Sequence, residues 1–322
     1  MAVYTHVSAE ALADFLTRYD VGDLVSVKGI AEGVENSNYL VDTSTGRFIL
    51  TLYEKRVAAA DLPYFMALLD HLVGKGLPVP PAIKDRDGRQ IQELEGRPAC
   101  LIKFLPGVSL SHPTAKQAFN TAQALANLHR AVADFVPTRA NSMGMPTWQP
   151  LWEQCGRSLN DIQPGLHHDL GFAIGDVIST WYAEEFDHCA IHADLFPDNV
   201  LMLSDTVGGL IDFYFACSDV RIYDLAIMHA AWSFDATGNH FHPAVGDAII
   251  AGYDSAYPLT TKDCAALYSF ASGACLRFTL SRAWDWLNTP PDALVTRKDP
   301  LTFWRRLKTY DPNLAGLLKT LR

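Results

Sequence analysis

The chain has 322 residues, of which 49% are hydrophobic and 19% charged, and its formal net charge at pH 7 is −10. This length suits one large domain or two lobes, and the composition, without a low-complexity tract, excludes a largely disordered protein. The acidic balance argues against a nucleic-acid partner, because nucleic-acid phosphates favour a basic protein surface.

No segment predicts membrane insertion or secretion. The longest uncharged apolar stretch, residues 264–276, is too short to cross a bilayer, and the N-terminus lacks a basic region followed by an apolar one. None of the six cysteines belongs to a C-x-x-C pair. We therefore expect a cytoplasmic protein that does not bind membranes, with buried free thiols rather than disulfides or a zinc site.

The first third of the chain alternates mostly between strand patterns and turns. Ser8 is expected to cap a helix, because apolar residues recur at helical spacing after it. Strands are expected at residues 24–28, 39–43, 48–53, 82–83 and 98–104, with turns at 42–46 and 85–88 and a helix at 62–73. This region therefore predicts about five antiparallel strands with one packing helix.

After residues 105–107 the pattern changes to helices. Helical spacing of apolar residues predicts helices at residues 114–132, within 152–161, at 170–186 and at 224–232, with further helices to the end of the chain. Between the helices predicted at 170–186 and 224–232, the pattern indicates short strands instead.

The most informative motif lies in that interval. Residues 192–199 read His-Ala-Asp-Leu-Phe-Pro-Asp-Asn, and an apolar hairpin with its turn at 204–205 leads from them to Asp212. Asp194 can accept the proton of an attacking hydroxyl, while Asn199 and Asp212 offer the oxygen ligands that Mg²⁺ prefers. This order of loop, hairpin and carboxylate predicts a phosphotransferase active site. It disfavours the alternative in which Asp194 caps a turn and Asp212 is an ordinary loop acid.

The turn between the first two strands is the candidate phosphate-binding segment. Gly29 and Gly33 would let backbone N–H groups approach phosphate oxygens, and Asn36 and Ser37 close the turn. An ordinary hairpin turn is the alternative, and the segment taken alone favours it. Residues 103–105 (Lys103, Phe104 and Leu105) would form a hinge whose backbone binds the adenine edge, or else an uneventful strand end.

The strand at 48–53 departs from the pattern expected of a nucleotide-binding lobe. Kinases place a phosphate-binding lysine there, and this chain has Thr51 at that position. Arg47 and Lys55 share the face of Thr51 in an alternating strand and are possible substitutes, although both also fit the interpretation of surface charges.

Taken together, these segments resemble the aminoglycoside phosphotransferase and choline kinase-like superfamily, and within it the homoserine kinases. The segments that carry the resemblance span nearly the whole chain: residues 32–39, 47–55, 77–81, 191–199, 211–213, 223–227 and 276–286. Thr51 in place of lysine and the arginine-containing segment 276–286 point to the homoserine subgroup.

The resemblance implies an α+β, protein kinase-like two-lobe fold. Residues 1–105 would form a small antiparallel-β N-lobe that binds the nucleotide, and residues 106–322 a larger, mainly helical C-lobe with the catalytic loop, metal and substrate sites. ATP and Mg²⁺ would be the cofactors, bound in the cleft between the lobes. The state would be a monomer or a homodimer.

Roles for individual residues follow from the same resemblance. Asp194 would be the catalytic base, and Asn199 and Asp212 the Mg²⁺ ligands. His192 would support the metal loop structurally, and Asp224 would hydrogen-bond backbone near the catalytic loop.

The implied reaction is ATP-dependent phosphorylation of the L-homoserine hydroxyl, which forms O-phospho-L-homoserine for threonine synthesis. Because homoserine is a zwitterion, its site needs a cation for the carboxylate and an acid or carbonyls for the ammonium group. Arg277, Arg282 and Asp285 are the candidates, although a surface ion pair between Arg282 and Asp285 fits their spacing equally well.

Two alternatives stay open at this point. One is a choline, aminoglycoside or other small-alcohol kinase, since tryptophans could supply an aromatic cage for choline. The other is a catalytically weak nucleotide-binding regulatory protein, since the phosphate-binding lysine is missing. The presence of Asp194, Asn199 and Asp212 together argues against the second alternative, because a protein that only binds a nucleotide needs no base.

Overall fold

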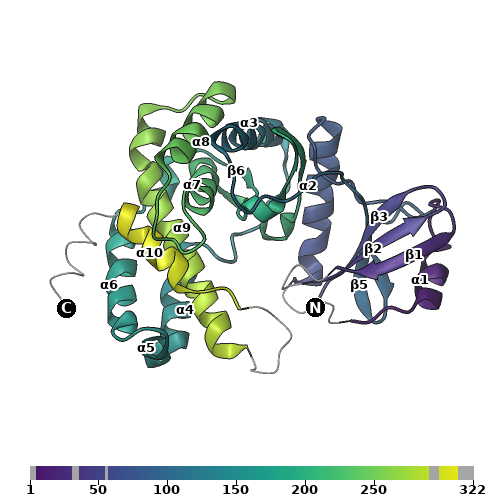
Figure 1. Cartoon of the computed structure of the whole chain (residues 1–322), viewed down its shortest axis with the longest axis horizontal. Helices are drawn as coiled ribbons and strands as arrows, with labels where there is room; N and C mark the ends of the chain where they lie inside the picture. Colours follow the sequence, from purple (N-terminus) through teal and green to yellow (C-terminus); the bar gives the residue numbers. More distant parts are fainter. Residues whose placement is uncertain (1–4, 31–35, 55–56, 290–296, 311–322) are drawn as a thin grey trace. The chain divides into compact units, whose positions relative to one another are not determined.

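The computed structural model describes residues 5–30, 36–54, 57–289 and 297–310. The chain divides into two compact units. The first comprises the described residues of Met1–Gly107 together with Gly208–Tyr214, and the second those of Val108–Val207, Phe215–Pro291 and Arg297–Arg322 (Figure 1). The expected α+β class is confirmed, since an antiparallel sheet forms the first unit and helices dominate the second. Residues 208–214 lie with the first unit, which the expected lobe boundary did not include.

An antiparallel five-stranded sheet builds the first unit, in the order β1-β2-β3-β5-β4. Its strands are β1 (Leu24–Gly29), β2 (Ser37–Thr43), β3 (Arg47–Leu52), β4 (Gln92–Leu94) and β5 (Arg97–Lys103). The predicted strands at 24–28, 39–43, 48–53 and 98–104 are confirmed within two residues at each end. Strand β2 shows the alternation of a strand with one buried face, because every second residue from Ser37 to Thr43 is buried.

The strand predicted at residues 82–83 is wrong. Around Ala82 the chain pairs with β5 through an isolated bridge to Ile102 and two backbone hydrogen bonds, which is too short a pairing to form a strand, and the remaining strand of the sheet is β4 instead. β4 pairs with β5 through a tight turn in which Glu95 and Gly96 both have positive φ, the backbone that two-residue hairpins favour. The predicted turn at 85–88 does form, because the Asp85 carboxylate accepts hydrogen bonds from the backbone N–H groups of Asp87 and Arg89.

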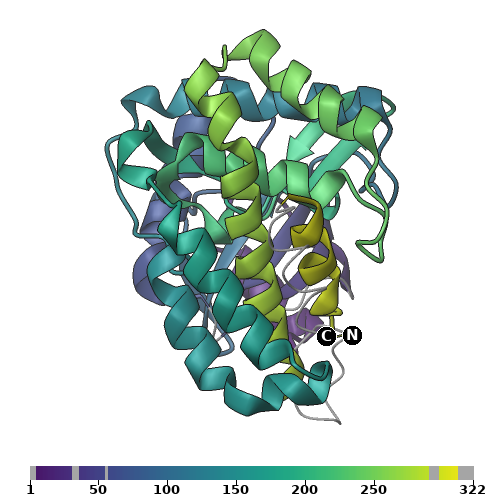
Figure 2. The same cartoon turned by 90° about the vertical axis from the view of Figure 1, so that its left-hand side faces the viewer.

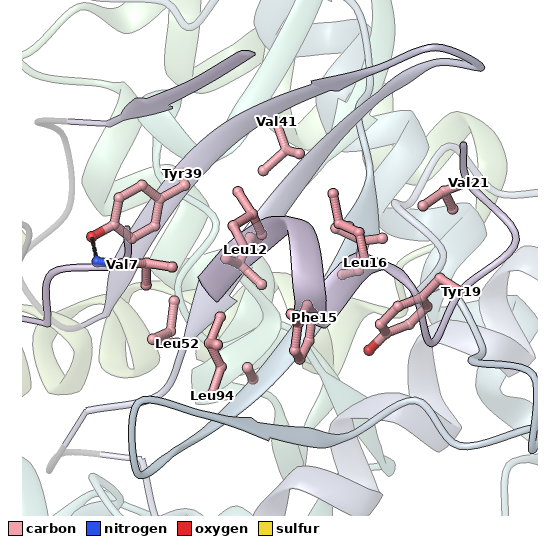
Figure 3. Packing of buried hydrophobic residues seen from close by; sticks show 13 residues of the cluster. Val7, Leu12, Phe15, Leu16, Tyr19, Val21, Tyr39, Val41, Leu52 and Leu94 are labelled. Carbon is pink, nitrogen blue, oxygen red and sulfur yellow. Dashed lines mark hydrogen bonds between the residues drawn. The ribbon is translucent and has the colours of Figure 1, made fainter. Parts of the chain in front are cut away.

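One face of this sheet is covered by α1 (Ala9–Leu16). The predicted cap is confirmed, since the Ser8 hydroxyl accepts a hydrogen bond from the Ala11 N–H. Figure 3 shows the apolar face of this helix among side chains of the sheet, and the Tyr39 hydroxyl accepting a hydrogen bond of 3.1 Å from the Val7 N–H. The fully buried members of this cluster include Leu12, Phe15, Leu16, Val41, Leu50 and Leu52.

The second helix of this unit is α2 (Leu62–Gly74), and it confirms the helix predicted at 62–73. It buries Leu62, Phe65 and Leu72 completely or nearly so. The ring of Phe65 meets that of Tyr214 edge-on, with 5.9 Å between the ring centroids. The segment that follows Asp212 is thus fastened to α2 within the first unit.

The second unit is built from helices around a long central one. Its helices are α3 (Ala115–Ala131), α4 (Trp148–Cys155), α5 (Leu159–Ile162), α6 (Leu166–Ser179), α7 (Arg221–Trp232), α8 (Pro243–Ala256), α9 (Thr261–Asn288) and α10 (Leu301–Tyr310). Helix α9 packs against α4, α6, α7 and α10, and Figure 2 shows it running through the middle of this unit. Because it has neighbours on several sides, its central residues 270–280 are all buried.

Capping and glycine geometry set several of these helix ends. The predicted helix at 114–132 is confirmed as α3, which starts at a capping box formed by Thr114 and Gln117. The predicted helix at 170–186 was placed too late, because α6 begins after Gly165, whose φ is 83°, and ends at Ser179. The segment at 152–161 is split by Gly156, whose φ of 53° interrupts the helix between α4 and α5.

Four short strands surround the motif at 192–199. Strand β6 (His188–Ile191) pairs antiparallel with β9 (Cys217–Val220), and β7 (Val200–Leu203) pairs with β8 (Thr206–Leu210). The predicted turn at 204–205 is confirmed, with Ser204 in the left-handed region at φ 58°. The motif therefore lies on the connection from β6 to β7, where a catalytic loop was expected.

All six cysteines are free, as predicted. Burial raises the pKa of the Cys275 thiol to about 12, so this sulfur stays protonated and unreactive at neutral pH. Cys264 is exposed and Cys189 is only partly buried, so these two depart from the expected burial. Among the helices that the structure describes, none combines the length and the apolarity that a membrane crossing requires.

His229 on α7 supplies a pH-dependent contribution to stability. Its imidazole is buried and its Nδ1 lies 2.6 Å from the Tyr310 hydroxyl of α10. Burial lowers the pKa of His229 from 6.5 to about 4. As the pH falls below ~6.5, His229 becomes protonated in the unfolded chain, whereas in the folded chain it stays neutral down to pH ~4. The contribution of His229 to the free energy of unfolding is therefore complete above this pH range and is lost as the pH is lowered through it.

We expect this titration to cost on the order of 3 kcal/mol of unfolding free energy between pH 6.5 and pH 4. The measurement is the free energy of unfolding against pH for the unsubstituted protein and for His229→Gln, which should show a shallower decline. His112→Gln is the matched control, because His112 is exposed. Equal slopes for all three proteins would show that His229 is not the titrating group.

Candidate active site

The turn that carries Asp194 is held by a buried carboxylate. After β6 ends, Ala193 adopts φ 62°, a left-handed conformation that alanine rarely takes. The carboxylate of Asp224 on α7 accepts hydrogen bonds from the backbone N–H groups of His192 at 2.7 Å and Ala193 at 2.8 Å. Asp224 thus occupies the place near the catalytic loop that the sequence suggested for it.

Asp224 is itself held by His129 of α3. The Nε2 of His129 lies 3.0 Å from the carboxylate, and its Nδ1 lies 2.7 Å from the Tyr253 hydroxyl of α8. Although burial alone would raise the pKa of Asp224, the hydrogen bonds from His129 and His192 hold it below its usual value. The carboxylate is therefore ionised at neutral pH, as a group that accepts two backbone N–H bonds should be. Sequence reasoning missed His129, because a lone histidine on a helix carries no signal of its own.

Asn199 is placed by its amide nitrogen. The Nδ2 group donates to the Asp194 carbonyl at 2.7 Å and to the Asp194 carboxylate at 3.2 Å. The second bond contributes to the orientation of the Asp194 side chain, and the first holds its backbone. They also leave the amide oxygen of Asn199 without a hydrogen-bond partner among the described residues, as a metal ligand requires.

His192 and Arg277 lie beneath this loop. His192 is fully buried, and its Nδ1 accepts a hydrogen bond of 3.3 Å from the Asp194 N–H. Arg277 of α9 is only 2% exposed, and its guanidinium donates to the Ala193 carbonyl. From the sequence, Arg277 was a candidate for the substrate carboxylate, and the structure instead shows its guanidinium bound to the backbone of the loop.

Asp212 lies in the first unit, two residues beyond the end of β8. Its φ of 66° places it in the left-handed region, as for Ala193. The nearby Tyr214 is half-buried, and its hydroxyl lies 3.3 Å from that of Tyr53. Burial raises the pKa of Tyr214, and the negative charge of the Asp212 carboxylate acts in the same direction.

The first-unit residues predicted to bind nucleotide are mostly engaged in the sheet. The Thr51 hydroxyl, 2% exposed as a residue, donates to the Asn38 side chain at 2.7 Å. The Ser37 hydroxyl is fully buried and donates to Glu54 at 2.8 Å, and the Asn36 side chain accepts from the Glu54 N–H at 3.4 Å. The charge expected of a phosphate-binding lysine is thus replaced at Thr51 by a neutral, internally bonded hydroxyl.

The other predicted nucleotide residues lie at strand ends. Gly29 ends β1, opposite Tyr39 of β2, whereas Gly33 and the possible lysine substitute Lys55 lie outside the described residues. Lys103 is the last residue of β5, and Phe104 and Leu105 follow it. The Phe104 N–H donates to the Arg47 carbonyl at 3.3 Å.

Arg47 itself is a surface charge, because its guanidinium forms an ion pair of 2.6 Å with Asp42 and its side chain is 50% exposed. Of the two interpretations of Arg47, a substitute for the phosphate-binding lysine or a surface charge, this ion pair favours the surface charge.

Arg282 lies near the catalytic loop on the aromatic side of α9. Its guanidinium lies 5.9 Å from the Phe196 ring centroid and 4.7 Å from that of Phe303. Burial lowers the pKa of Arg282 to about 10, and the Asp194 carboxylate is among the charges that act on it in the opposite direction. The guanidinium forms no hydrogen bond or ion pair with the part of the chain that the structure describes, and Asp285 follows it on the same helix.

No cluster of three or more histidine, cysteine, aspartate or glutamate residues suited to a metal occurs within the described ranges. Mg²⁺ does not require such a cluster, because it is commonly held by one or two side-chain oxygens together with water and substrate phosphates. The donor types of Asn199 and Asp212 fit that ion better than they fit zinc.

Comparison with known proteins agrees with this chemistry. The model of the phosphotransferase enzyme family matches residues 26–261. The homoserine kinase of Zymomonas mobilis is 49% identical over 312 residues, which cover 96% of this chain and 97% of that protein. The homoserine kinase of Rhodopseudomonas palustris is 47% identical over 317 residues, which cover 98% and 96%.

A solved structure also confirms the expected kinase-like fold. The amicoumacin kinase solved in complex with AMP-PNP, Ca²⁺ and Ami superposes with a TM-score of 0.74 over 97% of each chain, at 12% sequence identity. At that identity the likeness concerns the fold alone, and the two homoserine kinases carry the assignment within the family. The chain belongs to the phosphotransferase enzyme family and, within it, to the homoserine kinases.

Proposed function

We propose that the protein transfers the terminal phosphoryl group of ATP to the side-chain hydroxyl of L-homoserine, with Asp194 as the base. The observation that carries the proposal is the held geometry of the loop. Asp194 is fixed by Asn199, and the turn before it by Asp224, so a carboxylate stands in one orientation at the end of β6. A positioned carboxylate can accept the hydroxyl proton as the oxygen attacks phosphorus.

Mg²⁺ is the proposed metal, with the amide oxygen of Asn199 and the carboxylate of Asp212 as its protein ligands. When bound, the ion would neutralise charge on the phosphates. Asn199 suits this part because its amide nitrogen is already occupied by Asp194. The same residue would therefore connect the orientation of the base with the position of the metal.

Arg282 is the residue we propose for the homoserine carboxylate. An arginine is suited to this task because its planar guanidinium can bind both oxygens of a carboxylate. Arg282 has no ionic partner in the described chain, and the rings of Phe196 and Phe303 replace part of its water. Such a partly desolvated cation gains more from an anion than a fully hydrated one does. Arg277 is less suited, because its guanidinium already serves the Ala193 carbonyl.

We expect Arg282→Lys to raise the KM for homoserine about 10-fold or more while leaving the KM for ATP nearly unchanged. The substitution keeps the positive charge and removes the two-pronged geometry. Steady-state kinetics with each substrate varied in turn measures the two constants.

Arg305→Lys is the matched control, because the Arg305 guanidinium is already paired with Asp299 at 2.9 Å and should leave both constants unchanged. If Arg282→Lys moves the KM values of ATP and homoserine together, or lowers only the thermal stability, Arg282 does not bind the substrate carboxylate.

The remaining properties stay predictions from the sequence. These are the cytoplasmic location, the monomeric or homodimeric state, the absence of nucleic-acid binding, and the nucleotide-binding roles of Gly29, Gly33, Asn36, Ser37, Thr51, Lys103, Phe104 and Leu105.

A further inference from the structure

We infer that Arg277 is a positioning residue of the reaction, which holds the peptide group between Ala193 and Asp194 so that the Asp194 carboxylate faces its substrate. The inference rests on the proposed role of Asp194 as the base. It assigns to Arg277 a task different from binding the substrate carboxylate.

The first observation is that both ends of this peptide group are held. Its carbonyl oxygen, which belongs to Ala193, accepts a hydrogen bond from the Arg277 guanidinium. Its N–H group, which belongs to Asp194, donates to Nδ1 of His192 at 3.3 Å. Rotation of this peptide plane would turn the Asp194 side chain, so these two contacts act together with the bond from Asn199 to the carboxylate in setting where that carboxylate points.

The second observation is that the backbone here needs support. Ala193 has φ 62°, where the Cβ atom of an L-residue crowds the following carbonyl. Such conformations persist when the surroundings impose them, and they are concentrated at functional sites. Asp224 secures the N–H side of this turn through His192 and Ala193, and Arg277 secures its carbonyl side.

The third observation is that a charged group performs this task in a buried position. Arg277 is 2% exposed and belongs to the fully buried middle of α9. Burying a guanidinium is costly unless its interactions compensate for the lost water. A charge-assisted bond to a carbonyl is stronger than a neutral one, and the rings of Phe215 at 5.5 Å and Phe278 at 4.5 Å lie against the guanidinium.

These observations distinguish three roles for Arg277. A substrate ligand would have to bring its guanidinium to the carboxylate of homoserine, yet this one is buried and bound to Ala193. A packing residue of α9 would need no charge. A positioning residue uses the charged donor to hold backbone next to the base, and the Arg277 guanidinium is bound at that place, on the carbonyl of Ala193 in the turn before Asp194.

The test compares Arg277→Met and Arg277→Lys with the unsubstituted protein. We expect Arg277→Met to lower kcat by about 10- to 100-fold, because a misplacement of the base by about 1 Å has an effect of that order. The KM values for ATP and homoserine should stay within about 2-fold, since no substrate contact is lost. Arg277→Lys keeps a charged donor and should recover part of kcat.

Arg306 provides a matched control. It is 6% exposed, and its guanidinium donates to the backbone carbonyls of Ala230 at 2.8 Å and Ala231 at 3.3 Å. Arg306→Met removes an equally buried guanidinium from α10 and should lower the melting temperature while leaving kcat at saturating substrates close to normal. If Arg277→Met does not fold, Arg277→Lys and Arg277→Gln supply the same comparison with smaller losses of packing.

A double-substitution cycle with Asp194→Asn separates the inference from the proposed function. If Arg277 acts through Asp194, adding Arg277→Met to Asp194→Asn should lower kcat by less than about 2-fold, because the base it positions is already gone. Full multiplication of the two effects would overturn the inference, as would a selective rise in the homoserine KM or a loss confined to thermal stability. Near-full activity of Asp194→Asn alone would overturn the role of the base instead, whatever Arg277→Met does.

Discussion

Asp194→Asn is expected to lower kcat by about 10² to 10⁴, the usual contribution of a positioned general base. Asparagine has nearly the same size and keeps the backbone contacts of Asp194, among them the bond from Asn199 to its carbonyl. It cannot accept the hydroxyl proton, so the loss should fall on turnover while ATP binding and the melting temperature stay close to normal. Rapid-quench or coupled ADP measurements with saturating homoserine give kcat directly.

Asp212→Asn is the comparison that separates base from metal ligand. The substitution removes a charge that we assign to Mg²⁺ binding, so its activity should recover partly when the Mg²⁺ concentration is raised. Asp194→Asn should show no such recovery. Near-full activity of Asp194→Asn would remove this residue from the mechanism, and equal rescue of both variants by Mg²⁺ would mean that the two carboxylates share one role.

Local patterns predicted the elements of the fold well where side chains alone decide them. The Ser8 cap and the alternation in β2 are local signals, and both were correct. The segment at 82–83 pairs with β5 at Ile102 but over too short a stretch to form a strand, and the pairing of β4 with residues 97–99 of β5 depends on the tight turn at Glu95 and Gly96. The grouping of residues 208–214 with the first unit is likewise a tertiary fact, since it depends on contacts such as that between Tyr214 and Phe65.

The candidate site shows the same limit more sharply. The motif at 192–199 reveals residue types that suit a base and a metal, so the sequence suffices to nominate Asp194 and Asn199. It does not reveal what orients them. His129 and Arg277 are distant from the motif in sequence, and their contacts with Asp224 and Ala193 arise only when α3 and α9 pack around the loop. In the sequence alone, an arginine that binds substrate cannot be distinguished from one that binds backbone. For this reason the sequence suggested Arg277 as a ligand of the substrate carboxylate, whereas the structure shows it bound to the Ala193 carbonyl.

The proposed site should discriminate strongly between homoserine and other alcohols. A site that pairs both ends of a zwitterion leaves buried polar groups unpaired when a ligand lacks one of those ends, and discrimination of roughly 10⁴-fold can result. Choline has no carboxylate for Arg282. L-Serine keeps both charged groups but is one methylene shorter, a difference that typically changes efficiency by about 10- to 200-fold and that would also draw the hydroxyl away from Asp194.

The most direct test of homoserine phosphorylation is kcat/KM, measured by coupled ADP release, for L-homoserine, L-serine, choline and a kanamycin-like aminoglycoside under identical ATP and Mg²⁺ concentrations. We predict the highest value for L-homoserine, with L-serine at least about 10-fold lower and choline and the aminoglycoside lower still. A higher kcat/KM for choline or the aminoglycoside than for L-homoserine would contradict the assignment of homoserine as the substrate.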